Sequence, residues 1–284
     1  MTYREIYQQG FDTLVDAGVP DAKLDARLLL EYVCGTTQHD MILNGNRVLN
    51  EQEQARYEEL IAKRASRIPL QHLTGVQEFM GYTFKVNKHV LVPRQDTEIL
   101  VEEALQFLKP EMTVLDMCTG SGCILLSLLA LGQDVTGTGV DISAKALQVA
   151  TENVKQISAQ ADKDLSATFL ESDLFEKVTG KFDMIVSNPP YIASAVIDTL
   201  EPEVRLHEPL NALDGTADGL YFYERIVAES RDYLKENGLL IFEIGHDQGE
   251  AVSDFMKKAG FQGVYVKKDY AGLDRVVVGF FSED

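Results

Sequence analysis

Cysteine, long apolar runs and basic residues are all scarce in this chain of 284 residues. The 3 cysteines, Cys34, Cys118 and Cys123, fit no metal-ligand spacing and have apolar neighbours, so we expect reduced thiols in a core. No apolar run is long enough to span a bilayer. The first residues follow a helical pattern rather than that of a signal peptide, and we therefore expect a cytoplasmic protein with no membrane partner.

Basic residues are outnumbered by acidic ones, 26 to 45, which gives a formal net charge of −19. Residues 1–75 carry 8 basic and 11 acidic residues, so the remainder carries 18 basic and 34 acidic ones. A stable nucleic-acid partner would require a basic surface, and this balance argues against one. The charge favours a cationic small molecule or a basic protein partner, unless it only serves solubility.

The first 70 residues follow a helical pattern throughout. Apolar residues recur at helical spacing up to Gly18 and again up to Gly35, and Asn50 is placed to cap a third, longer helix. The segment contains no cluster of potential catalytic groups. We therefore interpret residues 1–70 as a small helical bundle that recognises the substrate, with a purely structural role as the alternative.

Residues 71–93 have a different pattern and predict a linker. Short alternating segments flank Gly81-Tyr82, which is typical of a β-hairpin with its turn at these two residues. The helix that follows would begin near residue 96, with Asp96 or Thr97 as its cap. We expect this linker to be short and ordered.

Strands and helices alternate from residue 94 to 284, which we interpret as the catalytic domain. Strands are expected at 114–117, 135–140, 167–171, 182–187, 238–244, 263–267 and 275–280. The β-α-β-α order predicts an α/β fold whose mostly parallel sheet is covered by helices on both faces.

The most informative stretch is Asn188-Pro189-Pro190-Tyr191, which follows the expected strand 182–187. Prolines cannot donate to a sheet ladder, so the strand ends there in a stiff loop. The Asn188 side chain and the Pro189 carbonyl can accept both hydrogens of a planar amide or amino group, and Tyr191 offers an aromatic face. The alternative is an ordinary turn with a packed tyrosine. A glycine-rich loop earlier in the chain favours a functional role for residues 188–191 over this alternative.

That glycine-rich loop, Thr119-Gly120-Ser121-Gly122, lies between an expected strand and helix, where the backbone can approach a ligand closely. Leu125 replaces the third glycine of a dinucleotide motif. Asp141, at the next strand end, can accept from two ribose hydroxyls, and Asp173 with Leu174 can frame an adenine ring. Together these residues indicate an adenosine cofactor without phosphates, which favours S-adenosylmethionine over NAD as the ligand. Each acid alone could instead be a helix cap.

The order of these stretches along the chain resembles the class I S-adenosylmethionine-dependent methyltransferases that modify planar nitrogens. It runs from residues 114–122 through Asp141 and Asp173 to Asn188-Pro189-Pro190-Tyr191. Further stretches are similar to one family among them, the release factor glutamine methyltransferases, and together they cover nearly the whole chain: 69–75, 91–98, 205–209, 212–215 and 269–275. Two departures from the family pattern are Gln95, where proline is usual, and Met80, where an aromatic residue is usual. Neither removes a group that the chemistry requires.

The resemblance implies a Rossmann-like sheet with an antiparallel terminal strand, and no metal. It implies methyl transfer from S-adenosylmethionine to the side-chain amide nitrogen of the glutamine in the Gly-Gly-Gln motif of peptide chain release factors. The implied cofactor-binding residues are Pro93, Arg94, Thr119, Gly120, Ser121, Gly122, Asp141, Ile142, Asp173, Leu174 and Asn188. The substrate would be bound by Asn188, Pro189, Pro190 and Tyr191, of which Asn188, Pro189 and Tyr191 are the expected catalytic residues.

Two other functions fit the sequence. An adenine-N6 DNA methyltransferase meets the same geometric problem at an exocyclic amino group, although it must also extrude a base and hold a polyanion, which this acidic chain opposes. A non-catalytic sensor of an adenosine cofactor would use the same strand-end residues. The roles of His207, Glu208 and Glu243 stay open from sequence.

Overall fold

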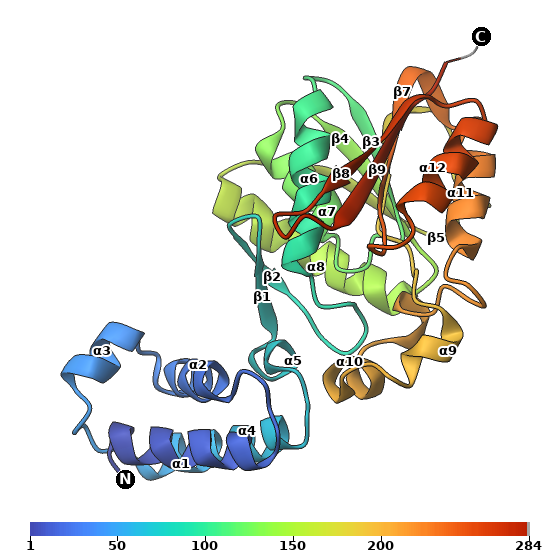
Figure 1. The fold of residues 1–284 in the computed structure, drawn as a ribbon. Coiled ribbons are helices and arrows are strands. Elements are labelled where there is room, and N and C mark those ends of the chain that lie inside the picture. Colours follow the sequence, from blue (N-terminus) through green and yellow to red (C-terminus); the bar gives the residue numbers. More distant parts are fainter. Residues whose placement is uncertain (283–284) are drawn as a thin grey trace. The chain divides into compact units, whose positions relative to one another are not determined.

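The computed structural model of the protein describes residues 1–282 and is shown as a ribbon in Figure 1. The chain forms two compact units. Unit 1 contains residues 1–75 and 201–207; unit 2 contains residues 76–200 and those from 208 onward. The membership of residues 201–207 in unit 1 is not predicted by the sequence pattern. Within the described part, no helix is both long and apolar enough to cross a membrane.

Unit 1 is a helical bundle. Its helices are α1 (Tyr3–Asp16), α2 (Ala22–Cys34), α3 (Gln38–Leu43), α4 (Glu51–Ala65), α5 (Leu70–Thr74) and α10 (Pro202–His207). The Asn50 side chain accepts from the Glu53 amide while the Glu53 side chain accepts from the Asn50 amide, which confirms the predicted cap of α4. Buried side chains of α1, α2 and α4 form the core of this unit. The short helices α3 and α5 are not predicted, because so few residues show no helical period.

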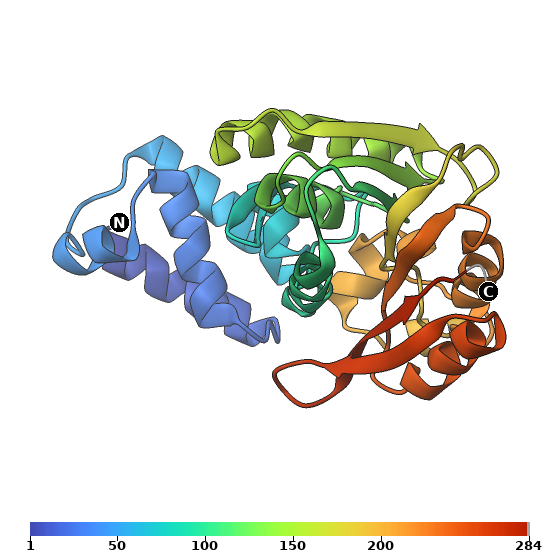
Figure 2. The same ribbon diagram turned by 90° about the horizontal axis from the view of Figure 1, so that it is seen from above.

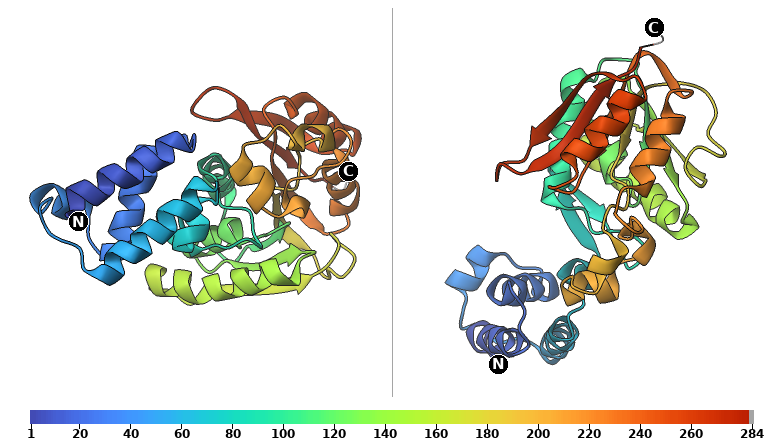
Figure 3. Two further views of the ribbon diagram at one scale, coloured as in Figure 1. Left: turned by 90° about the horizontal axis from the view of Figure 1, so that it is seen from below. Right: turned by 45° about the vertical axis from the view of Figure 1, so that its right-hand side comes forward.

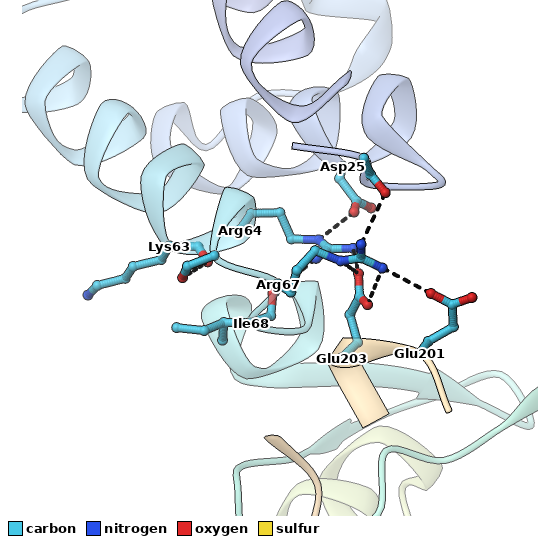
Figure 4. A network of polar contacts seen from close by, with 9 residues as sticks. Asp25, Lys63, Arg64, Arg67, Ile68, Glu201 and Glu203 are labelled. Atoms are coloured by element: carbon cyan, nitrogen blue, oxygen red, sulfur yellow. Dashed lines mark hydrogen bonds and ion pairs between the residues drawn. The ribbon is translucent and has the colours of Figure 1, made fainter. Parts of the chain in front are cut away.

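A network of ion pairs ties α10 to α4 within unit 1 (Figure 4). The Arg64 guanidinium donates from Nε to Asp25 at 2.7 Å and from Nη2 to Glu203 at 2.8 Å. Arg67 donates to both oxygens of Glu203, at 2.7 and 2.6 Å, and to Glu201 at 3.1 Å. Two planar arginines thus share one carboxylate of α10, an arrangement that fixes position as well as charge.

Unit 2 begins with the predicted β-hairpin, β1 (Val76–Phe79) and β2 (Tyr82–Lys85). Its turn lies at Met80-Gly81 and not at Gly81-Tyr82, because φ is 51° at Met80 and 79° at Gly81, the pair of positive values that a tight hairpin turn requires. The Met80 amide donates to the Glu98 carboxylate at 2.6 Å. Met80 therefore serves the turn, and it does not line the cavity described below.

Seven strands form the sheet of unit 2, in the order β5-β4-β3-β6-β7-β9-β8. They are β3 (Thr113–Met117), β4 (Thr136–Asp141), β5 (Ser166–Glu171), β6 (Phe182–Ser187), β7 (Leu234–Glu243), β8 (Gln262–Lys268) and β9 (Asp274–Phe280). β9 runs antiparallel to β7 and β8, and the other neighbours are parallel. The predicted α/β fold with an antiparallel terminal strand is confirmed. The β8–β9 hairpin is red at one edge of the sheet in Figure 3.

Helices cover both faces of the sheet (Figure 2). One face packs against α6 (Gln95–Phe107), α7 (Cys123–Leu131) and α8 (Ala144–Ala161), and the other against α11 (Tyr221–Ser230) and α12 (Gly249–Lys258). Residues of β7 alternate between the two cores: Leu239 and Ile241 join the first, Leu240 and Phe242 the second. Strands buried on both faces read as continuous apolar runs, which is why the sequence located them.

The start of α6 differs from the prediction. The helix begins at Gln95 with Arg94 at the N-cap position and no side-chain cap, so the assignment of Asp96 or Thr97 as its cap is wrong. Pro93 precedes this entry and restricts the backbone before it. Thr97 is instead inside the first turn and buried, and its hydroxyl contacts the proline loop at the end of β6.

The long connection after β6 contains α9 (Ser194–Ile197) and the 3-10 turn η1 (Leu210–Ala212). The chain leaves unit 2 after residue 200, forms α10 in unit 1 and returns at residue 208. Ile192 and Asp214 pair in a short parallel bridge at the two ends of this connection within unit 2. The segment that begins at residue 208 then forms part of the site.

Candidate active site

A cavity of about 620 Å³ opens in unit 2 beyond the carboxyl ends of β3, β4, β5 and β6. Met117, Asp141, Ser172 and Asn188, each at or just after a strand end, line it. The order of the strands changes direction between β3 and β6, and parallel sheets bind ligands at such a switch point.

The glycine-rich loop forms one wall of the cavity and is held by a buried carboxyl. The Thr119 hydroxyl donates to Asp116 Oδ2 at 2.6 Å, and the Leu125 amide donates to the same oxygen at 3.3 Å. Burial raises the pKa of Asp116 to about 7. Gly122 has φ of 78°, and a Cβ there would lie 3.2 Å from the Leu126 side chain, so this position requires glycine.

Asp141 closes the turn after β4. Its Oδ2 accepts from the Gly120 amide at 2.9 Å and its Oδ1 from the Ser143 amide at 2.8 Å. Burial raises the pKa of Asp141, and the backbone hydrogen bonds act against that rise. Each carboxylate oxygen has a second acceptor site, so the two can still receive ribose hydroxyls.

Asp173 lines the same cavity with Leu174 beside it. One oxygen of Asp173 is paired with Arg225 of α11 at 2.9 Å, a contact that the sequence does not predict. The side chain of Asp173 is 41% exposed, so its second oxygen can face a ligand. Leu174 is buried and takes a positive φ of 44°, which turns the chain sharply after Asp173.

The corner after β6 presents Asn188 to the cavity. The Asn188 Nδ2 group donates to the Thr97 hydroxyl at 3.3 Å, which leaves the carboxamide oxygen as an acceptor. The Ser187 hydroxyl donates to the Met117 carbonyl at 2.6 Å and locks β6 to β3. Tyr191 donates to Glu243 Oε1 at 3.4 Å. The corner is therefore rigid on both sides of the two prolines.

Arg94 and Glu208 form an ion pair at the entrance of α6. Arg94 Nη2 donates to Glu208 Oε2 at 2.7 Å, and the Val92 amide donates to Glu208 Oε1 at 3.2 Å. Burial raises the pKa of Glu208, while Arg94 acts against the rise. Glu208 thus ties the segment after α10 to the loop around Pro93, which itself lines the cavity.

Ten of the predicted site residues line one cavity: Pro93, Thr119, Gly120, Ser121, Asp141, Ile142, Asp173, Leu174, Asn188 and Pro190. Gly122, Arg94, Pro189 and Tyr191 do not line it. Each of the four is next in the chain to a residue that lines the cavity: Gly122 follows Ser121, Arg94 follows Pro93, and Pro189 and Tyr191 flank Pro190. Their predicted roles in binding and catalysis stay predictions.

Several lining residues were missed by sequence reasoning. Leu91, Pro209 and Ala212 lie in stretches that resemble the family but had no predicted site role, whereas His89, Val90, Leu210, Asn211 and Phe222 lie outside those stretches. Cys118 and Cys123 also line the cavity, and burial raises the thiol pKa of Cys123 to about 12. All 3 cysteines are free, as expected, although Cys34 and Cys118 are only half-buried.

Comparison with known proteins agrees with this geometry. The family model of the PrmC N-terminal domain matches residues 5–75, and that of the methyltransferase small domain matches residues 95–201. The crystal structure of a methyltransferase from Pyrococcus furiosus is similar in fold, with a TM-score of 0.55 at 16% identity, over 78% of this chain and 99% of that one.

Two curated relatives match over almost their whole lengths. The release factor glutamine methyltransferase of Caulobacter vibrioides is 42% identical over 94% of this chain and 92% of its own. That of Geobacter sulfurreducens is 39% identical over 98% of this chain and 96% of its own. With a catalytic sheet, a strand-end cavity and an asparagine-proline corner in the expected places, the chain belongs to the release factor glutamine methyltransferase family.

Proposed function

We propose that this protein transfers a methyl group from S-adenosylmethionine to the side-chain amide nitrogen of the glutamine in the Gly-Gly-Gln motif of peptide chain release factors. The observation that carries the proposal is the Asn188 carboxamide, whose NH₂ group is bound to Thr97 and whose oxygen is left for a ligand in the cavity. Family membership supports it. Because release factors act in translation, the proposal includes a cytoplasmic location for the reaction.

The residues of the cavity fit an adenosine cofactor. The positive φ of Gly120, 55°, opens the loop without a side chain, Asp141 has acceptor sites for ribose hydroxyls, and Leu174 offers an apolar edge for a base. The buried Asp116 Oδ1 has no hydrogen-bond partner within the described structure, and it adds negative potential beneath the loop only when this carboxyl is ionised. When bound, S-adenosylmethionine would supply an electrophilic methyl group on a sulfonium and leave as S-adenosylhomocysteine.

The proposed role of the corner after β6 is to orient the side-chain amide of the substrate glutamine. An amide nitrogen is a weak nucleophile because its lone pair is delocalised into the carbonyl. Asn188 Oδ1 and the Pro189 carbonyl would accept its two N–H hydrogens, which fixes the nitrogen and stabilises positive charge as it develops there. Positioning would supply most of the acceleration, and one N–H proton would leave to water after transfer. Tyr191 would hold the corner and offer its ring to the flat amide.

Mass spectrometry of a release factor before and after incubation with the protein and S-adenosylmethionine tests the proposal. One added methyl on the Gly-Gly-Gln glutamine is expected, and none on a release factor in which that glutamine is replaced by glutamate. A methyl group at another residue, or none at all, would overturn the proposal. The adenine-N6 DNA methyltransferase and the cofactor sensor considered from sequence are not favoured by the relatives. Filter binding of DNA at low salt, with no retention expected, checks the first.

A further inference from the structure

Gln248, the N-cap residue of α12, carries a buried carboxamide that the proposed chemistry does not use directly. The residue is 9% exposed and does not line the cavity. Its Nε2 donates to the Tyr191 carbonyl at 3.0 Å and to the Gly219 carbonyl at 3.3 Å. Its Oε1 accepts from the Gly245 amide at 2.9 Å. One side chain thus connects three loops of unit 2 through their backbones.

The three partners fix which way round the Gln248 carboxamide lies. A backbone carbonyl can only accept a hydrogen bond, and a backbone N–H can only donate one. The NH₂ group must therefore face Tyr191 and Gly219, and the oxygen must face Gly245. A reversed side chain would lose all three hydrogen bonds and set like groups against each other.

The peptide group between Tyr191 and Ile192 is held from both sides. Its carbonyl accepts from Gln248, and its N–H, which points the opposite way across a trans peptide, donates to the Leu213 carbonyl at 3.0 Å. The Ser187 hydroxyl anchors the other end of the corner to β3, as described above. Between these two anchors, the adjacent prolines have fixed φ angles. The backbone of the corner therefore has few ways to turn.

Two glycines pack against the corner at very short range. A Cβ at Gly219 would lie 2.3 Å from the Tyr191 carbonyl oxygen and 2.9 Å from Gln248 Nε2. A Cβ at Gly215 would lie 2.8 Å from the Pro190 carbonyl oxygen and from the Tyr191 Cα. Only glycine allows the backbone to approach this closely. These contacts limit where the corner lies, and the hydrogen bond from Gln248 limits how its last peptide group turns.

We propose that Gln248 is a positioning residue that holds the corner in the orientation needed for methyl transfer. The Asn188 carboxamide and the Pro189 carbonyl, the two expected acceptors for the glutamine amide, lie between the anchors at Ser187 and Tyr191. Since the prolines fix φ, little of a rotation at Tyr191 can be absorbed before it reaches the Pro189 carbonyl. Gln248 acts on kcat through the corner rather than by contact with the ligands. The inference deepens the proposed function and rests on it.

Two variants of the full-length protein test the inference with a release factor and S-adenosylmethionine. Gln248→Glu keeps the size of the side chain and the acceptor for Gly245, but it sets an oxygen against the carbonyls of Tyr191 and Gly219. We expect kcat to fall about 10²-fold, the loss that a small misplacement causes. Gln248→Met removes the donor without adding a repulsion, and here we expect a fall in kcat of about 10-fold. The cofactor Kd from calorimetry should stay within about 2-fold in both, since the lost interaction serves the transition state.

Gln156→Met in α8 is the matched control. Gln156 Nε2 also donates to a backbone carbonyl, that of Thr83 in the hairpin, and the residue does not line the cavity. We expect its kcat and Kd to equal those of the wild type. Wild-type kcat in either Gln248 variant, a rise in the cofactor Kd as large as the fall in kcat, or an equal loss in Gln156→Met would overturn the inference, so one folded Gln248 variant suffices. If the wild type itself transfers no methyl group, the proposed function fails instead.

Discussion

Asn188 is the residue on which turnover should depend most. Asn188→Ala removes the acceptor for one substrate N–H and leaves the backbone of the corner unchanged, because the two prolines that follow fix it. We expect kcat to fall about 10² to 10³-fold, the loss seen when one preorganised group of this kind is removed. Calorimetry should show S-adenosylmethionine affinity within a few-fold of wild type. Near-normal turnover would take Asn188 out of the mechanism.

Asp141 should act on the cofactor and much less on the chemical step. In Asp141→Asn one side-chain oxygen becomes NH₂ and must face a backbone N–H of Gly120 or Ser143, so the turn loses one hydrogen bond and the ribose loses an acceptor. We expect the Kd for S-adenosylmethionine to rise about 10-fold or more, with kcat at saturation far less changed. The exposed Asp164→Asn is the control for lost charge. An unchanged Kd would refute the ribose role.

Residues with a local signal could be predicted from the sequence, and residues that act through distant contacts could not. Asn188 is marked by two adjacent prolines and Asp141 by its place after a strand. Thr97 looks like a helix cap in sequence, yet its partner Asn188 lies 91 positions away. No sequence pattern indicates a role for Glu243, because its environment depends on which distant side chains the sheet brings around it.

At the scale of elements, the ion pairs of α10 should stabilise unit 1. Glu203→Ala leaves Arg64 and Arg67 without their shared carboxylate, and the Arg64 side chain is only 6% exposed. Both arginines keep a second acid, Asp25 for Arg64 and Glu201 for Arg67, so the cost is that of the lost hydrogen bonds to charged groups, about 1.5–3 kcal/mol. We expect a corresponding loss in the free energy of unfolding measured with urea.

Glu201→Ala is the matched control for that experiment. Glu201 also pairs with Arg67, at 3.1 Å, but its side chain is 70% exposed. An exposed pair of this kind contributes less than about 1 kcal/mol. Equal losses in the two variants would show that burial of Glu203 is not what stabilises α10.

Elements were predicted where their own residues specify them. The strands of the sheet are short apolar runs between turns, so their positions followed from sequence, and the long helices followed from their period. The hairpin turn was placed one residue late, because its positive φ falls on Met80 as well as on Gly81. Glu203 of helix α10 pairs with Arg64 and Arg67, which lie far earlier in the chain, so the place of α10 in unit 1 has no local signal.

For the whole molecule, stability should rise as pH falls from neutral. Asp116 and Glu243 have folded-state pKa values of about 7, well above the values of free carboxyls near 4. Between those limits the folded state binds more protons than the unfolded state, so the free energy of unfolding decreases as pH rises. The net charge of −19 acts in the same direction.

Thermal unfolding at pH 5.5 and pH 7.5 measures this effect. We expect a higher Tm at pH 5.5, where each kcal/mol gained raises Tm by about 2–4 °C for a domain of this size. Asp116→Asn should flatten the dependence. Glu203, whose pKa is lowered by Arg67 and Arg64 against the effect of burial, loses its contribution only at more acidic pH. A Tm that declines steadily from pH 7.5 to 5.5 would contradict the assignment of these carboxyls.

The return of residues 201–207 to unit 1 has a practical consequence for dissecting the protein. No single cut separates the two units, since the polypeptide passes between them three times. A fragment ending at residue 75 would lack the acid that Arg64 and Arg67 share, and a fragment starting at residue 76 would carry α10 without the two arginines with which its Glu203 pairs. Each half can be studied alone only if that helix is grafted onto the first and a short bridge replaces it in the second.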